Sequence, residues 1–145
     1  MKREQWLLEI ICGLTALLFI YTAASKLLEY EQFRQEIFNQ AFNPVLFPVI
    51  IYGLPPAELF VAVMLLVPKL RLAGLYLSTL LMILFTGYVG LVTFHFYDRV
   101  PCSCAGVFKH MSWPVHLAFN LVFTVATIYG IKIFNAQRIR EKLKT

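Results

Sequence analysis

Long apolar stretches alternate with short polar links along the whole chain. Residues 72–96 carry no Asp, Glu, Lys or Arg over 25 consecutive positions, whereas about 20 apolar residues are enough to cross a bilayer as a helix. Three further stretches, 6–25, 44–67 and 115–134, are nearly as apolar. The pattern predicts an all-α polytopic membrane protein, in which four transmembrane helices form one bundle and a single domain over residues 1–145.

Composition agrees with this assignment. Hydrophobic residues make up 59% of the chain and charged residues only 14%, with a mean hydropathy of +0.70. A soluble domain usually carries about a quarter charged residues, so this chain has too few polar side chains to cover a soluble globule. Its first partner is therefore the lipid bilayer.

The second apolar stretch, residues 44–67, contains helix-breaking residues. Proline lacks the N–H that a helix needs, and glycine often ends a helix. The spacing therefore predicts a broken span, in which one helix ends near Gly53 and another opens at Pro55 and Pro56. Glu58 would lie in the first turn of the second piece, where free backbone N–H groups and the helix dipole favour a carboxylate.

The link between the first two stretches, residues 26–43, has apolar side chains at helical spacing with charged residues between them. These apolar side chains are Leu27, Tyr30, Phe33, Ile37 and Phe38. The pattern predicts a short amphipathic helix on the periplasmic side. Such a helix lies either on the outer face of the bilayer or as a lid on the bundle, and the sequence favours neither.

Basic residues are distributed unevenly between the two ends of the predicted bundle. If both termini lie on one side, nine Lys and Arg residues flank that side and four flank the other. The nine are Lys2, Arg3, Lys69, Arg71, Lys132, Arg138, Arg140, Lys142 and Lys144, and the four are Lys26, Arg34, Arg99 and Lys109. Because basic flanks stay inside, we predict cytoplasmic termini in the inner membrane of a bacterium. The net charge of +5 thus reflects topology, and no nucleic-acid partner is expected.

The second outward link, residues 97–112, carries Cys102 and Cys104 in a Cys-Ser-Cys sequence. On the periplasmic side thiols can be oxidised and disulfides persist. A disulfide between cysteines two positions apart closes a very small ring, so it should be strained and easily reduced. We interpret the two cysteines as a catalytic redox pair, with Gly106 allowing a tight turn beyond them. An inert or purely structural role is the alternative.

Two other uses of cysteine are weighed against this interpretation. Cys12 lies inside the first span near its cytoplasmic end, too far from the outward pair to form a disulfide, and is expected to be a packed core thiol. His95, His110 and His116 bracket the outward cysteines, and two thiolates with two imidazoles suit zinc or copper. The spacing matches no standard zinc pattern, however, so no metal ligand is assigned.

Glu58 is the one acidic residue deep in a predicted span. An ionisable group there is expensive in free energy and is a functional-site candidate. It would cap the break in the second span, relay protons, or do both. Lys26 ends the first span and can extend toward the outer surface, with Glu29 or Asp98 as its candidate partners.

Polar residues also flank the cysteine link. His95 and Tyr97, at the outer end of the third span, could donate hydrogen bonds to a quinone, and His95 is also a candidate for proton handling. His116 and Asn120 lie one turn apart on the fourth helix and should share a face, where His116 would support the link or a quinone. The fourth helix is expected to start near Ser112, so its positive end could stabilise a thiolate.

Three short segments together resemble the MauE/DoxX family of small, four-helix bacterial inner-membrane proteins. These segments are SKLLEYEQF after the first span, LPPAEL in the second and CSCAG after the third. The resemblance implies that the family positions are Lys26, Glu58, Cys102, Cys104 and Gly106, although alanine follows the second cysteine where the family often has an aromatic residue. It also implies disulfide chemistry with a thioredoxin-like partner, as in MauE-like members, and a link to quinones, as in DoxX relatives.

These observations lead to two hypotheses about function. In the first, the protein relays electrons between a periplasmic thioredoxin-like partner and the quinone pool through its Cys-Ser-Cys pair. Quinone-coupled oxidases of this kind commonly use a second cysteine pair, which this chain lacks on its outward side, so whether it is a complete enzyme stays open. In the second hypothesis the protein is a non-enzymatic membrane anchor or assembly subunit of a larger envelope complex.

Overall fold

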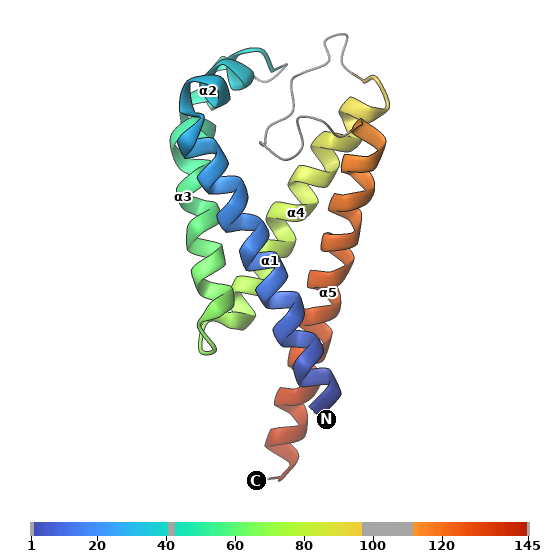
Figure 1. Cartoon of the computed structure of the whole chain (residues 1–145). Coiled ribbons are helices and arrows are strands. Elements are labelled where there is room, and N and C mark those ends of the chain that lie inside the picture. Colours follow the sequence, from blue (N-terminus) through green and yellow to red (C-terminus); the bar gives the residue numbers. More distant parts are fainter. Residues whose placement is uncertain (1, 41–42, 97–111, 145) are drawn as a thin grey trace.

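The computed structural model describes residues 2–40, 43–96 and 112–144, and its regular elements there are helices. Four long helices cross the molecule, and each is long and apolar enough to span a membrane. They are α1 (Lys2–Leu28), α3 (Phe47–Leu66), α4 (Arg71–Thr93) and α5 (Trp113–Lys144), with a short helix α2 (Tyr30–Phe38) and a 3₁₀ turn η1 (Pro44–Leu46) between α1 and α3 (Figure 1). The predicted all-α fold with four spans is confirmed.

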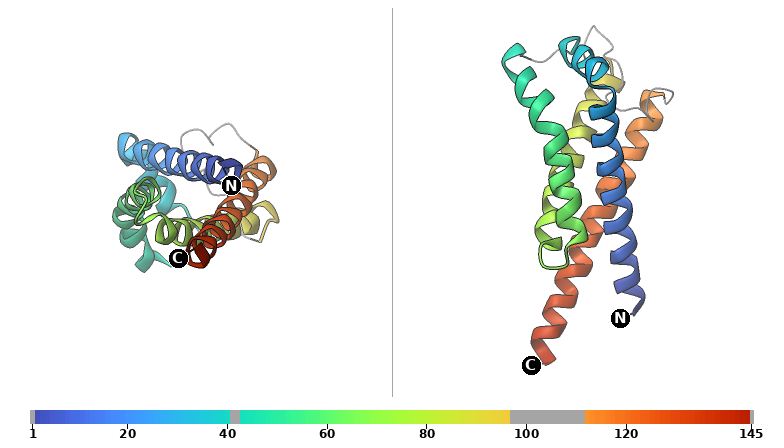
Figure 2. Two further views of the ribbon diagram at one scale, coloured as in Figure 1. Left: turned by 90° about the horizontal axis from the view of Figure 1, so that it is seen from below. Right: turned by 60° about the vertical axis from the view of Figure 1, so that its left-hand side comes forward.

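The four long helices associate as two pairs. Helix α1 packs along α3, and α4 packs along α5; Figure 1 shows the two pairs diverging toward the end of the bundle that carries α2. Both termini lie at the opposite end, beyond the turn that joins α3 to α4 (Figure 2). We call these the α2 end and the terminal end. The chain crosses the bundle four times, so both termini lie at the same end, as the sequence predicted.

Close contacts hold the two pairs together toward the terminal end. Gly130 of α5 lies where an added Cβ would be 3.1 Å from Leu75 of α4 and 3.4 Å from Ile11 of α1. The Arg71 guanidinium donates to both carboxylate oxygens of Glu9, at 2.8 and 3.2 Å, and to the Leu65 carbonyl oxygen at 3.2 Å. One arginine at the start of α4 thus joins α1 and the last turn of α3.

The predicted break in the second span is wrong. Helix α3 is continuous from Phe47 to Leu66, with Pro55 and Pro56 inside it. Each proline removes the N–H that would bond the carbonyl four residues earlier, but a membrane helix tolerates this loss when neighbouring helices pack against it. Helix α1 packs against α3 in this way. Glu58 consequently lies in the interior of a helix and not in its first turn.

The predicted amphipathic helix is present as α2, and it packs as a lid. Phe33 and Ile37 of α2 are buried in a cluster with Phe47 and Ile51 at the start of α3. The polar side of α2 carries Glu31, whose side chain is 75% exposed. Because the apolar side of α2 is covered by α3, the structure favours the lid over a helix lying on the bilayer surface.

Inside the bundle, α1 contributes a stripe of buried residues at spacings of three and four. Leu8, Cys12, Ala16 and Phe19 are each at most 2% exposed and belong to one apolar cluster with residues of α3, α4 and α5. This spacing places them on one face of a helix. Cys12 is therefore a packed core thiol, as predicted.

Candidate functional site

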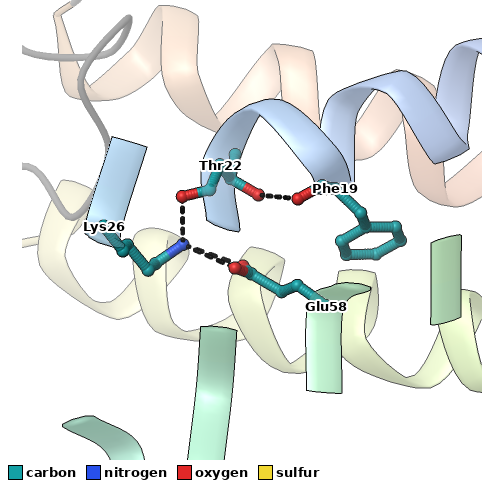
Figure 3. A network of polar contacts seen from close by, with 4 residues as sticks. All are labelled: Phe19, Thr22, Lys26 and Glu58. Carbon is teal, nitrogen blue, oxygen red and sulfur yellow. Dashed lines mark hydrogen bonds and ion pairs between the residues drawn. The ribbon is translucent and has the colours of Figure 1, made fainter. Parts of the chain in front are cut away.

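A lysine and a glutamate from different helices form an ion pair inside the bundle. The Lys26 Nζ atom, near the C-terminus of α1, lies 2.8 Å from Oε1 and 3.0 Å from Oε2 of Glu58 in α3 (Figure 3). The two side chains are only 5% and 1% exposed. The expectation that Lys26 extends toward the outer surface is wrong, because Lys26 points inward to Glu58; its candidate partner Asp98 lies outside the described residues.

Residues one turn earlier on α1 supply further hydrogen-bond partners around this pair. Thr22 lies one turn before Lys26, and its carbonyl oxygen accepts a hydrogen bond from Nζ at 3.5 Å. The Thr22 hydroxyl donates in turn to the Phe19 carbonyl oxygen at 3.2 Å (Figure 3). Three oxygen atoms thus face the ammonium, which has three N–H donors.

Helix α2 closes the site on the remaining side. The Phe33 ring is 3% exposed, and its centroid lies 6.0 Å from Nζ of Lys26. At this distance the face of an aromatic ring attracts a cation. The lid therefore covers the pair with a group that stabilises the lysine charge.

The chemistry open to the pair follows from its burial. Removing two charges from water is costly, and only a close partner with further hydrogen bonds compensates for it. Ionisable residues within a membrane commonly pair with one another, and they mark proton or ligand sites as well as structural ties. The Lys26–Glu58 pair can therefore tie α1 to α3, bind and release a proton, or do both.

His95 occupies a different part of the molecule. It is exposed at the C-terminal end of α4, with a φ of 55°. Its N–H donates to the Val92 carbonyl at 3.1 Å, and the N–H of Phe96 donates to the Leu91 carbonyl at 3.0 Å. This is the Schellman pattern, in which a left-handed residue ends a helix. In the described part of the chain, no hydrogen bond or ion pair joins His95 to the Lys26–Glu58 pair.

His116 and Asn120 share a buried face of α5, as predicted. They are 8% and 5% exposed, and the His116 ring stacks on Trp113 with 6.2 Å between centroids. One turn further along, the hydroxyl oxygens of Thr124 and of Thr86 in α4 are 3.1 Å apart. A row of polar side chains thus follows the interface between α4 and α5 from the α2 end inward.

Several predicted site residues lie outside the described residues. They are Tyr97, Cys102, Cys104, Gly106 and His110. The structure does describe the helix ends that their link joins, since α4 ends at Thr93 and α5 begins at Trp113. Both of these ends lie at the α2 end of the bundle (Figure 1).

The partnership of Lys26 with Glu58 is the feature that sequence reasoning missed. The residues are separated by 32 positions, and α2 and half of α3 lie between them. Their opposite charges within two otherwise apolar stretches were the available signal, because buried ionisable groups in membranes tend to pair.

The fold and the site together define a class: small multi-pass membrane proteins whose helix bundle holds a buried ion pair near one end. The family model for methylamine utilisation protein MauE matches residues 4–133. This match covers most of the chain, including Lys26, Glu58 and the Cys-Ser-Cys segment, so the chain belongs to the MauE family. Comparisons with curated proteins and with solved structures found no significant match.

Proposed function

We propose that this chain is an inner-membrane thiol–disulfide redox protein, in which Cys102 and Cys104 carry electrons from a periplasmic thioredoxin-like partner to the quinone pool. The observation that carries the proposal is the arrangement of the chain ends. Both termini lie at one end of the bundle, whereas the helix ends joined by residues 97–111 lie at the other (Figure 1). The nine-to-four excess of basic residues on the terminal side favours a cytoplasmic location for that side, and hence a periplasmic one for the cysteine link.

The proposed reaction consists of two linked two-electron steps. First, a thiolate of the reduced partner attacks the Cys102–Cys104 disulfide, and the mixed disulfide resolves so that the partner leaves oxidised and both cysteines become thiols. Second, the two thiols lose two electrons and two protons to a quinone, which becomes the quinol, and the Cys102–Cys104 disulfide forms again. Because the chain has one outward pair, a further cysteine-bearing subunit is a candidate partner.

The Lys26–Glu58 pair has two roles in this proposal. It ties α1 to α3 at the α2 end, and its carboxylate is the buried group that would hold one of the two protons in transit from the thiols to the quinone. His116, buried beside Trp113 at the start of α5, is the described residue that would support the link or a quinone. Tyr97 and Gly106 keep their proposed supporting roles, whereas His95 fits the role of ending α4 better than that of handling protons.

A non-enzymatic anchor or assembly subunit of a larger envelope complex is the second candidate function. Gly87 favours it, because this residue is exposed on α4 and, beyond the neighbouring backbone of α4, no atom of the described residues lies within 4 Å of a Cβ placed there. A second membrane helix could therefore approach the backbone closely at this point. The cysteines would then form a local staple without turnover.

The cysteine count allows a sharp test in intact cells. Cells are quenched with acid, and free thiols are labelled under denaturing conditions with a maleimide that adds a fixed mass. The chain has three cysteines, of which Cys12 is a core thiol. An oxidised outward pair therefore gives one mass tag and a reduced pair gives three. We expect one tag in wild-type cells and accumulation of three-tag protein when quinone is depleted.

Three variants make this readout interpretable. Cys12→Ser should shift the two states to no tags and two tags, without changing their dependence on quinone. Cys102→Ser and Cys104→Ser should each give two tags whatever the quinone supply. A pair whose state ignores quinone, or that stays reduced throughout, would exclude the relay and leave the assembly subunit as the function.

A further inference from the structure

One polar side chain inside the bundle has no hydrogen-bond partner among the described residues. Asn120 follows Trp113 on α5 by roughly 10 Å along the helix axis and is 5% exposed. Its backbone carbonyl accepts a hydrogen bond from the Thr124 hydroxyl at 2.7 Å, but in residues 2–40, 43–96 and 112–144 no hydrogen bond involves its side-chain amide. A buried amide without a partner costs free energy, especially in a membrane, where water cannot replace that partner. The amide is therefore the first indication of a ligand.

Contacts before and after Asn120 hold this part of α5 against α4. Three residues earlier, the Leu117 side chain lies 3.8 Å from a Cβ added at Gly90 of α4. Four residues later, the hydroxyl oxygen of Thr124 lies 3.1 Å from that of Thr86 in α4. Residues three and four apart share a helix face. Asn120 thus lies in the same interface as these contacts, and its backbone is fixed relative to α4.

Aromatic rings lie beside the amide on α5. The rings of Phe119 and Phe123 have 4.8 Å between their centroids and are tilted by 37°. Phe123 follows Asn120 by three residues, so the two side chains are neighbours on the helix surface. Small-molecule sites are commonly built in this way, from apolar and aromatic side chains with a few polar groups that fix the orientation of the ligand.

The amide and the rings together favour one class of ligand. A water molecule would bond to the amide and leave the rings unused, and an ion would lose its hydration without gaining a charged partner. The head ring of a quinone is flat, enters the membrane interior and carries carbonyl oxygens that accept hydrogen bonds. Because an amide has both N–H donors and a carbonyl acceptor, it can bond to the quinone and to the hydroxyl of the quinol.

We propose that the Asn120 amide binds the head ring of a membrane quinone, with the Phe119 and Phe123 rings beside it. A side-chain N–H of Asn120 donates to a carbonyl oxygen of the quinone, and Oδ1 accepts from a hydroxyl of the quinol. Since the quinone is the electron acceptor of the proposed function, this site rests on that function and adds the residues that hold the acceptor.

Tryptophan fluorescence can localise the bound quinone, because the chain has two tryptophans and quinones quench their emission. Trp113 begins α5, two turns before Asn120, whereas Trp6 lies near the start of α1 at the terminal end. The purified full chain in detergent is titrated with decylubiquinone and with a short-chain menaquinone, once as Trp6→Phe and once as Trp113→Phe. We expect at least one of the two quinones to quench Trp113 saturably. Trp6 should show only the linear quenching caused by quinone dissolved in the micelle.

Two matched substitutions test the role of the amide in the Trp6→Phe chain. Asn120→Leu removes the amide at nearly constant volume and should raise the dissociation constant about fivefold or more, the loss expected for one hydrogen bond. Asn135→Leu is the control, because Asn135 is half-buried and lies roughly 22 Å further along the same helix. This substitution should leave the dissociation constant unchanged.

Photolabelling of the unsubstituted chain gives a readout that does not depend on the folding of any variant. An azidoquinone is bound to the purified protein and activated by light, and the labelled peptides are identified by mass spectrometry. We expect the label on residues 117–124 of α5 or on residues 86–90 of α4, which face them. Excess unlabelled quinone or quinol should prevent the labelling.

The outcomes separate this site from the proposed function. If neither quinone quenches Trp113 saturably, both the site and the quinone step of the proposed function are wrong. If binding is saturable but Asn120→Leu and Asn135→Leu bind equally well, or if the label attaches to other segments, Asn120 is not the binding group. The dependence of the cysteine pair on quinone, measured by thiol tagging in cells, would be unaffected by that second result.

Discussion

Lys26 and Glu58 are charged residues in a part of the bundle where water has no access, since their side chains are 5% and 1% exposed. The two charges compensate each other, and the Thr22 carbonyl and the Phe33 ring further stabilise the lysine ammonium. A buried pair of this kind adds little net stability compared with apolar residues of similar size, but loss of one partner leaves an uncompensated buried charge. The two residues are therefore strongly coupled.

This coupling predicts a specific pattern in a double-mutant cycle. Lys26→Met and Glu58→Gln should each lower the free energy of unfolding by about 3–5 kcal/mol. The double variant Lys26→Met/Glu58→Gln should recover at least half of that loss, because no unpaired charge remains. Equilibrium unfolding of the purified protein in detergent with increasing SDS measures all four proteins.

An exposed pair on α2 provides the control for this cycle. Arg34 and Glu31 are 3.9 Å apart, with side chains 49% and 75% exposed, so Arg34→Gln should change stability by less than about 1 kcal/mol. If the losses of the two buried single variants simply add in the double variant, Lys26 and Glu58 are not coupled, and the pair described here does not form in the membrane.

At the scale of single residues, the sequence indicated which positions matter but not which of them meet. Glu58 was identified because it is alone in an apolar stretch, and Lys26 because it ends one. Their contact depends on how α1 packs along α3, which local patterns do not specify. His95 shows the converse. Its residue type suggested proton chemistry, whereas its φ of 55° and its place after α4 indicate a helix-ending role that no sequence pattern had suggested.

At the scale of helices, the prediction of spans was accurate because apolar length and charge are local properties. The break in the second span was wrong because the proline rule considers one helix in isolation. A freed carbonyl costs more inside a membrane, where no water can bond to it, but neighbouring helices and local adjustment of the backbone can satisfy it, so a helix packed along its neighbours continues. For α2, the amphipathic pattern gave the helix, and only the cluster with Phe47 and Ile51 distinguished the lid from a surface helix.

The close approach of α3 and α4 at their connected ends requires a glycine at position 74, and this requirement can be tested. A Cβ added at Gly74 would lie 2.9 Å from the backbone nitrogen of Leu65 and 3.0 Å from Met64, so the two helices would have to separate. Gly74→Ala should therefore lower the free energy of unfolding by about 1–3 kcal/mol, the usual cost of overpacking. The same SDS unfolding measurement detects this change.

A second glycine gives the matched control. Gly13 lies on α1, and apart from the adjoining backbone of α1 no atom in the described part of the chain is within 4 Å of a Cβ built there. Gly13→Ala should be neutral or raise stability by up to about 1 kcal/mol, because alanine is the better helix former. If Gly74→Ala proves as stable as Gly13→Ala, α3 and α4 do not approach each other as closely as the structure shows.

At the scale of the whole molecule, four spans and a shared location for the two termini follow from the sequence alone. The association of the helices as α1 with α3 and α4 with α5 does not, because every span is similarly apolar and several pairings would bury similar surfaces. Particular contacts hold this arrangement: Gly130 against Leu75 joins α5 to α4, Lys26 with Glu58 joins α1 to α3, and Arg71 with Glu9 joins the two pairs. Each joins residues far apart in the chain.

The orientation of the whole molecule decides which compartment the cysteine link faces, and it can be measured separately from any activity. In a background with Cys12, Cys102 and Cys104 replaced by serine, single cysteines are introduced as Glu31→Cys in α2 and Lys69→Cys in the turn between α3 and α4. Both positions are exposed, and they lie at opposite ends of the bundle (Figure 1).

The excess of basic residues at the terminal end predicts that this end stays in the cytoplasm. A membrane-impermeant maleimide should then label Glu31→Cys in cells with a permeabilised outer membrane, and Lys69→Cys only after lysis. The opposite labelling would place the link of residues 97–111 in the cytoplasm, where thiols are kept reduced, and would remove the basis for a periplasmic redox partner while leaving the fold unchanged.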